Sequence, residues 1–245
     1  MRLLLAILSF IFFGNSFAQS SFEKANSAYE NEQYEIAIQN YMETLSNGER
    51  SADLYYNLGN AYFKTNELGE AIWAYEQAQK LNPSDKDIQF NLQFCNDLTV
   101  DKLTINNKGI GNWITKVLFS YSHNFWFYIS LLSALITVIS LYIFFTPTNT
   151  AVNNITLVLG GLFSLILISS VIIGAIHKAR LTEQSRIVII APKNKILIQP
   201  SSESATSFEL HEGATANIKS AQDDWYEVEL NSNTGWILKE AVWSY

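Results

Sequence analysis

The chain has 245 residues, of which 48% are hydrophobic and only 16% are charged, and its formal net charge is −7 at pH 7. Soluble domains are usually about 25% charged, so part of this chain differs from them in composition. Acidic residues outnumber basic ones by fourteen to seven in residues 19–110 and by nine to five in residues 183–245. Neither end therefore has the excess positive charge that nucleic acid or anionic lipid requires, which argues against both ligands. The single cysteine, Cys95, excludes an intramolecular disulfide and a cysteine-based metal motif, and we expect it to be a small buried apolar residue.

Residues 1–18 have the layout of a secretory signal peptide. Arg2 precedes an apolar stretch over residues 3–13, and Ser16 and Ala18 occupy the −3 and −1 positions of a small-x-small cleavage site. The alternative is an uncleaved N-terminal anchor, which predicts the same topology for the remainder of the chain.

Residues 19–100 have the periodicity of packed helices, and the pattern recurs after 34 residues. A shift by 34 superposes Ala25 on Gly59, Asn26 on Asn60, Ala37 on Ala71 and Tyr41 on Tyr75. This period is typical of the tetratricopeptide repeat, an antiparallel helix pair in which small residues let the helices approach closely. Residues 52–85 follow the pattern closely, and residues 18–51 are a weaker copy. After Pro83, a capping Ser or Asp predicts a single closing helix.

Two runs without Asp, Glu, Lys or Arg, residues 125–145 and 155–176, predict two transmembrane helices. The segment "TPTNTAVNN" between them predicts a tight hairpin turn. The pairs Gly160 with Ser164 and Ser170 with Gly174 have the small-xxx-small spacing that packs membrane helices. Residues 101–124 before the first run predict a polar linker that ends in a short amphipathic helix at the membrane surface.

From residue 185 the pattern alternates in the manner of β-strands. Five or six short apolar segments separated by "PKN", "PSSESATS", "HEG" and "NSNTG" predict a small closed barrel. The predicted fold class is thus a multi-domain membrane protein with α-helical tetratricopeptide repeats, two transmembrane helices and a small all-β SH3-like barrel.

The segments "DDWYEVELNSNTGWI" and "FELHEGATANI" resemble bacterial SH3-type domains. The full order of segments resembles the BatE type of the aerotolerance (Bat) operon proteins. That resemblance implies a non-enzymatic envelope protein that acts beside von Willebrand A-domain Bat proteins and a MoxR-type ATPase in oxidative-stress tolerance.

A cleaved signal would place both soluble ends in the periplasm, with the protein in the bacterial inner membrane. The charges disagree in part, because Lys178 and Arg180 follow the second run while the hairpin turn has no charge, and the positive-inside rule prefers the opposite orientation.

The sequence does not contain the common catalytic motifs. His123, His177 and His211 are widely separated, and adjacent Asp223 and Asp224 in a turn are expected to be solvated. No GxSxG, HExxH, GxGxxG or Gly-rich phosphate loop is present, so we expect no enzymatic activity, cofactor or metal.

Binding through the first helix of each repeat is the favoured function. Asn26 and Tyr29 in the first repeat and Asn60 and Phe63 in the second are expected to face a groove that reads an extended peptide. The alternative is that the Asn residues only cap or solvate this groove. If they read a peptide, Asn60→Ala should weaken partner capture without changing the melting temperature.

In the barrel, Trp225, Tyr226 and Trp236 resemble an aromatic ligand strip. Strand alternation places Trp225 and Tyr226 on opposite faces, with Trp225 the more exposed, and Trp236 is expected in the core in preference to the strip. The rival function is that of a cell-wall sensor whose barrel contacts peptidoglycan while the repeats relay to membrane partners.

Overall fold

The computed structural model describes residues 16–101, 118, 120–146, 149–182 and 186–244. Residues 1–15 of the predicted signal peptide and most of the predicted linker and interfacial helix lie outside the described residues. The chain divides into two compact units. One contains the repeats and the C-terminal strands, and the other contains the two long apolar helices.

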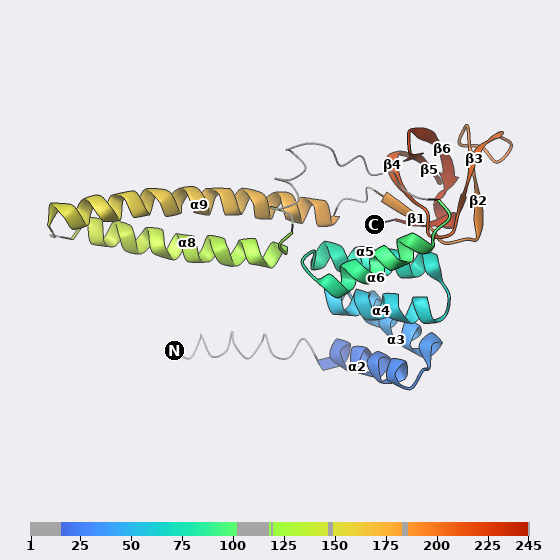
Figure 1. Ribbon diagram of the computed structural model, residues 1–245, viewed down its shortest axis with the longest axis horizontal. Helices are drawn as coiled ribbons and strands as arrows, with labels where there is room; N and C mark the ends of the chain where they lie inside the picture. The colour runs from blue at the N-terminus through green and yellow to red at the C-terminus, as the bar shows by residue number, and fades with distance from the viewer. Residues whose placement is uncertain (1–15, 102–117, 119, 147–148, 183–185, 245) are drawn as a thin grey trace. The chain divides into compact units, whose positions relative to one another are not determined.

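Five amphipathic helices form the repeat part of the first unit (Figure 1). Gly59 lies where a Cβ atom would be 2.8 Å from the ring of Tyr75, so only glycine permits this helix pair to pack so closely. Ala37, Tyr41 and Ala71 are fully buried, as the repeat pattern requires. Asp85 accepts hydrogen bonds from the backbone N–H groups of Asp87 and Ile88 and so caps the closing helix. The helices are α2 (Ser16–Glu30), α3 (Tyr34–Ser46), α4 (Ala52–Lys64), α5 (Leu68–Leu81) and α6 (Lys86–Leu98).

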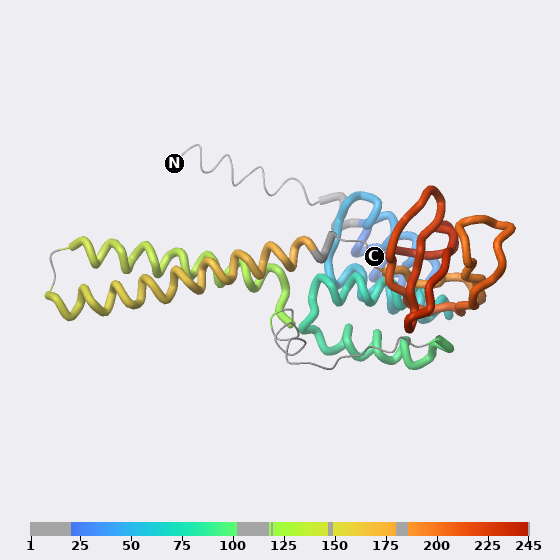
Figure 2. The backbone as a smooth tube through the Cα atoms, turned by 90° about the horizontal axis from the view of Figure 1, so that it is seen from above, coloured from blue at the N-terminus to red at the C-terminus, as the bar shows by residue number. Residues whose placement is uncertain are grey.

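The second unit is a helical hairpin in which α8 (His123–Phe144) lies beside α9 (Thr150–Thr182) (Figure 2). By length and composition, both helices could cross a membrane, over residues 123–145 and 150–179. A Cβ atom at Gly160 would lie 3.3 Å from Cβ of Ser140 on α8, so this small residue does pack the hairpin. Helix α9 begins at Thr150, which makes the turn shorter than the predicted nine-residue segment because "TAVNN" already belongs to the helix.

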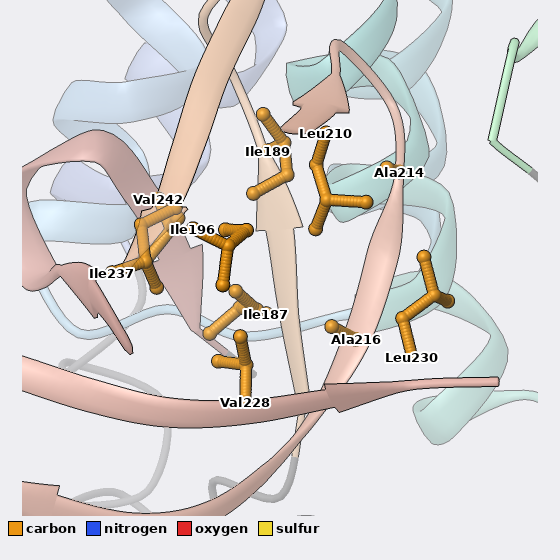
Figure 3. Close-up of a cluster of buried hydrophobic side chains, with 10 residues drawn as sticks. All are labelled: Ile187, Ile189, Ile196, Leu210, Ala214, Ala216, Val228, Leu230, Ile237 and Val242. Atoms are coloured by element: carbon orange, nitrogen blue, oxygen red, sulfur yellow. The ribbon is translucent and has the colours of Figure 1, made fainter. Parts of the chain in front are cut away.

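The C-terminal part of the first unit is an antiparallel sheet of seven strands, in the order β3-β2-β6-β5-β4-β1-β7. The prediction of five or six strands missed β3, whose first residues continue the Ser/Thr-rich segment that predicted a loop. Figure 3 shows the apolar cluster that the strands enclose, with Ile187, Ile196, Val228 and Ile237 among its members. The strands are β1 (Arg186–Ile189), β2 (Lys193–Leu197), β3 (Thr206–His211), β4 (Thr215–Gln222), β5 (Trp225–Leu230), β6 (Asn233–Leu238) and β7 (Val242–Ser244).

One face of α5 contacts this sheet directly. At the start of the helix, a Cβ atom at Gly69 would lie 2.5 Å from the carbonyl oxygen of Ile189. The backbones of α5 and β1 are therefore in direct contact at this point. One turn further, Trp73 packs edge-on against Trp243 with ring centroids 4.8 Å apart, and its Nε1 donates a hydrogen bond to the carbonyl oxygen of Ser244 at 3.1 Å. We refer to the seven-stranded sheet as the barrel, and to its contact with α5, Thr99 and Asp101 as the repeat–barrel junction.

A glycine in the turn before β4 completes the junction. Gly213 has a φ of 79°, in the left-handed region that favours glycine. A Cβ atom there would lie 2.7 Å from Cγ2 of Thr99 and 2.9 Å from Cδ1 of Ile72. The turn can therefore approach the helices only because this residue has no side chain.

Candidate functional site

The first helices of the repeats share a small cavity of about 80 Å³. Its lining includes Tyr29 of α2, Asn60 and Phe63 of α4, and Asn91 and Phe94 of α6. We call the surface formed by these five residues the repeat groove. Three of the four predicted peptide-binding residues belong to it, and Asn26 does not line the cavity.

The two predicted asparagines accept hydrogen bonds within the fold. The hydroxyl of Tyr41 donates to Oδ1 of Asn26 at 2.7 Å, and Nδ2 of Asn57 donates to the same oxygen at 3.0 Å. In the next repeat, the Tyr75 hydroxyl donates to Oδ1 of Asn60 at 2.7 Å and Nδ2 of Asn91 donates at 3.0 Å. The 34-residue period thus extends to individual hydrogen bonds.

Burial keeps the tyrosines of this network protonated. It raises the pKa of both Tyr41 and Tyr75 well above the ordinary value of 10.0, so their hydroxyl groups remain hydrogen-bond donors at any physiological pH. The carbonyl oxygens of Asn26 and Asn60 are therefore occupied by structural bonds. A peptide in the groove would have to use the amide nitrogens of these residues.

The aromatic residues give the groove its accessible apolar surface. Phe94 is 48% exposed and its ring centroid lies 5.8 Å from that of Phe63, at an interplanar angle of 71°. Phe94 and Asn91 were missed because they lie on the closing helix, outside the two repeats. The period does point to Asn91, which follows Asn57 by 34 residues, and to Phe94, which follows Asn60 by the same interval.

Cys95 also lines the groove cavity, but its thiol is unsuited to chemistry. The residue is buried, and burial raises its pKa to about 12. At neutral pH the nucleophilic thiolate is thus essentially absent, and Cys95 serves as the small apolar residue that the sequence predicted.

The three residues of the predicted ligand strip, Trp225, Tyr226 and Trp236, do not all lie on the same face of the sheet. Tyr226 packs against the apolar cluster of the barrel, and the amino group of Lys239 lies 5.2 Å from its ring centroid. Trp225 lies on the opposite face of β5. The prediction that Trp236 is a core residue is wrong, because Gly235 and Ile237 are buried and strand alternation directs Trp236 to the face of Trp225.

Trp225 and Trp236 are close neighbours on this outer face. Trp236 pairs with Glu227, two residues along β5 from Trp225, and Trp225 itself pairs with Leu238. Diagonal neighbours on adjacent strands are close enough for large side chains to touch. Both tryptophans are partly exposed. They form an aromatic surface that we call the barrel strip.

The remaining predicted features lie where solvation was expected. Asp223 and Asp224 are both exposed, in the turn between β4 and β5. Among the described residues, no group of three or more His, Cys, Asp or Glu side chains is arranged to hold a metal ion.

Comparisons with known proteins agree with the domain content. Residues 22–87 match the family described as tetratricopeptide repeat, and residues 193–244 match the family described as bacterial SH3 domain. None of the curated proteins compared matches the chain. The first match indicates protein–protein interaction and the second indicates cell-wall binding.

Proposed function

We propose that this protein is a non-enzymatic, membrane-anchored scaffold that binds protein partners through its repeat groove. The observation that carries the proposal is the aromatic pair of half-buried Phe63 and exposed Phe94 beside the polar groups of Asn60 and Asn91. Aromatic anchors next to amide groups suit an extended peptide, whose side chains and backbone need both. Two repeats offer a short groove, so the expected complexes are transient.

The proposed partners are von Willebrand A-domain Bat proteins in an envelope complex linked to oxidative-stress tolerance. The order of repeats, two apolar helices and SH3-type domain supports this assignment because it resembles the BatE type. The proposed location is the bacterial inner membrane, with both soluble parts in the periplasm.

Photo-crosslinking in cells tests the groove. With p-benzoylphenylalanine in place of Phe94, we expect adducts that contain a von Willebrand A-domain protein, identified by mass spectrometry. The matched control is the same substitution at Ile36 of α3, which is 49% exposed against 48% for Phe94 and does not line the groove. Equal adducts at both positions, or none at position 94, would contradict the proposal.

The barrel strip favours a second function, in which the SH3-type domain contacts peptidoglycan and the protein acts as a cell-wall sensor. Trp225 and Trp236 offer adjacent flat apolar surfaces that suit stacking against sugar rings, and they lie on the sheet face away from the barrel core. The two functions are compatible, because the groove and the strip use different residues.

Co-sedimentation of the detergent-solubilised full chain with purified peptidoglycan tests the strip. The full chain is required because an isolated barrel would expose Trp243, which packs against Trp73. We expect Trp225→Ala or Trp236→Ala to weaken binding by roughly tenfold, since an aromatic anchor contributes more than about 1 kcal/mol. Phe90→Ala is the control because Phe90 is 68% exposed on α6. Equal retention of all variants would remove the peptidoglycan function and leave the scaffold function intact.

A further inference from the structure

The repeat–barrel junction contains a buried carboxyl group. Glu76 of α5 is 7% exposed, and its Oε1 lies 3.3 Å from Nη1 of Arg186 on β1. Arg186 also donates from Nη2 to Oγ1 of Thr215 on β4, at 2.9 Å. The ion pair therefore connects the second repeat to two strands of the barrel.

The second oxygen of this carboxyl group is not satisfied. Oε2 of Glu76 is inaccessible to solvent and has no hydrogen-bond partner among the described residues. A buried carboxylate is stable only when its oxygens accept hydrogen bonds or face cations. One arginine contact at 3.3 Å meets this requirement for Oε1 alone, so the ionised form is poorly accommodated.

The other charged groups around the junction do not offset this cost. Glu76 lines a cavity of about 290 Å³ together with Arg186, Asp97 and Asp101. Asp101 accepts hydrogen bonds from the backbone N–H and Nδ1 of His211. Desolvation raises the pKa of Glu76 to about 7, against smaller opposing contributions from Arg186 and from Lys80 on the same helix. Geometry and charge agree that the closed junction favours the neutral form of Glu76 more than solvent does.

We propose that Glu76 is a proton-binding site through which the repeat–barrel junction responds to pH. The proton comes from solvent and is held on the carboxyl group while the barrel is docked on α5. When the carboxyl group ionises, the junction loosens, because water can then solvate both of its oxygens. The position of the barrel on the repeats is thereby coupled to proton concentration near neutrality.

The sign of this coupling follows from proton linkage. In the open junction Glu76 is solvated and titrates near 4.5, whereas in the closed junction its pKa is about 7. The closed state thus binds the proton more tightly, and closure strengthens as pH falls from about 8 towards 5. Between pH 8 and pH 6 the closing equilibrium should change about tenfold.

Two backbone amides report on the junction directly. The N–H of Gly69 donates to Oε1 of Glu212, and the N–H of His211 donates to Oδ2 of Asp101, so each bond joins the repeat part to the barrel. Hydrogen exchange of the peptides that contain Gly69 and His211 can be followed in the full chain in detergent at pH 6 and pH 8. Comparison with a variant at the same pH cancels the pH dependence of intrinsic exchange.

At each pH, the protection of these amides in the wild-type protein is divided by their protection in Glu76→Gln. We expect this ratio to be about tenfold higher at pH 6 than at pH 8. Burial raises the pKa of Glu70 to about 6, and its titration contributes equally to both proteins. Glu209→Gln is the matched control, because it removes an exposed carboxylate that pairs with Lys193 and leaves Glu76 and Arg186 unchanged. This control should keep the wild-type response.

A second variant decides the outcome if Glu76→Gln does not fold. Arg186→Gln removes the cation that lowers the pKa of Glu76, so the midpoint of the pH response should move above 7. The proposal is overturned if Glu76→Gln keeps the wild-type response or if the midpoint in Arg186→Gln is unchanged.

Discussion

Asn60 illustrates how a residue that the repeat pattern predicts for recognition is also part of the hydrogen-bond network of the fold. The repeat pattern predicted an amide that faces the groove, and Asn60 does line it. Its carbonyl oxygen, however, accepts hydrogen bonds from Tyr75 and from Asn91 of the closing helix. The amide therefore joins α4, α5 and α6, a role that no local pattern reveals.

Asn60→Ala is consequently expected to destabilise the protein, which revises the expectation of an unchanged melting temperature. The substitution removes the acceptor of two hydrogen bonds and leaves the hydroxyl of Tyr75, 2% exposed, without its principal partner. We expect the free energy of unfolding of the repeats to fall by about 2 kcal/mol.

Chemical denaturation followed by circular dichroism measures this loss. Gln93→Ala, which removes an exposed amide from α6, serves as the control and should leave the midpoint unchanged. A loss below about 0.5 kcal/mol for Asn60→Ala would show that the bonds to Tyr75 and Asn91 contribute little. For tests of binding, variants of Phe63 or Phe94 are preferable, since neither belongs to the asparagine network.

Helix α5 has a different role on each of its faces. Ala71, Tyr75 and Ala78 are buried among the repeat helices, as the pattern predicted. Gly69, Ile72, Trp73 and Glu76 form the face that meets the barrel. The corresponding residues of the first repeat are Glu35, Ile38, Gln39 and Met42. Trp73 occupies the position that Gln39 has in the first repeat. A large apolar side chain on the outer face of a repeat helix indicates that another part of the chain covers this face.

The strands show where element prediction reaches its limit. The segment "WYEVEL" was identified by its alternation, because successive side chains of a strand point to opposite faces. The segment "RIVII" was identified as a short apolar run, and its residues 187–189 are all buried. Strand β3 begins with Thr206 and Ser207, both exposed, and only Leu210 is fully buried. An edge strand with few core residues has little periodicity, so its composition resembles a loop.

The whole molecule constrains its own topology in a membrane. The repeats and the barrel contact each other at the junction, so we expect both to lie on the same side of a membrane that α8 and α9 cross. The chain between them contains two helices that are long and apolar enough to span, and an even number of spans returns the chain to its starting side.

Alkaline phosphatase fusions determine on which side of the membrane the repeats and the barrel lie. We expect an active enzyme when it is fused after Tyr245, because export by the signal peptide would place the barrel outside the cytoplasm. A fusion between the two apolar helices, at Asn149, should be inactive for the same reason. The opposite pattern, an inactive fusion at Tyr245 and an active one at Asn149, would favour the orientation that Lys178 and Arg180 suggest.

The sequence alone determined the helical repeats, the two apolar helices and the β-rich end, because periodicity and hydrophobic length are properties of neighbouring residues. Only the tertiary structure decided that Asn60 joins three helices, that Trp236 faces outwards and that the barrel rests on α5. Glu76 and Arg186 are 110 residues apart, and by residue type each would be expected at a solvent-exposed position of its own segment. Their pairing depends on how two separately patterned parts meet, which no local pattern encodes.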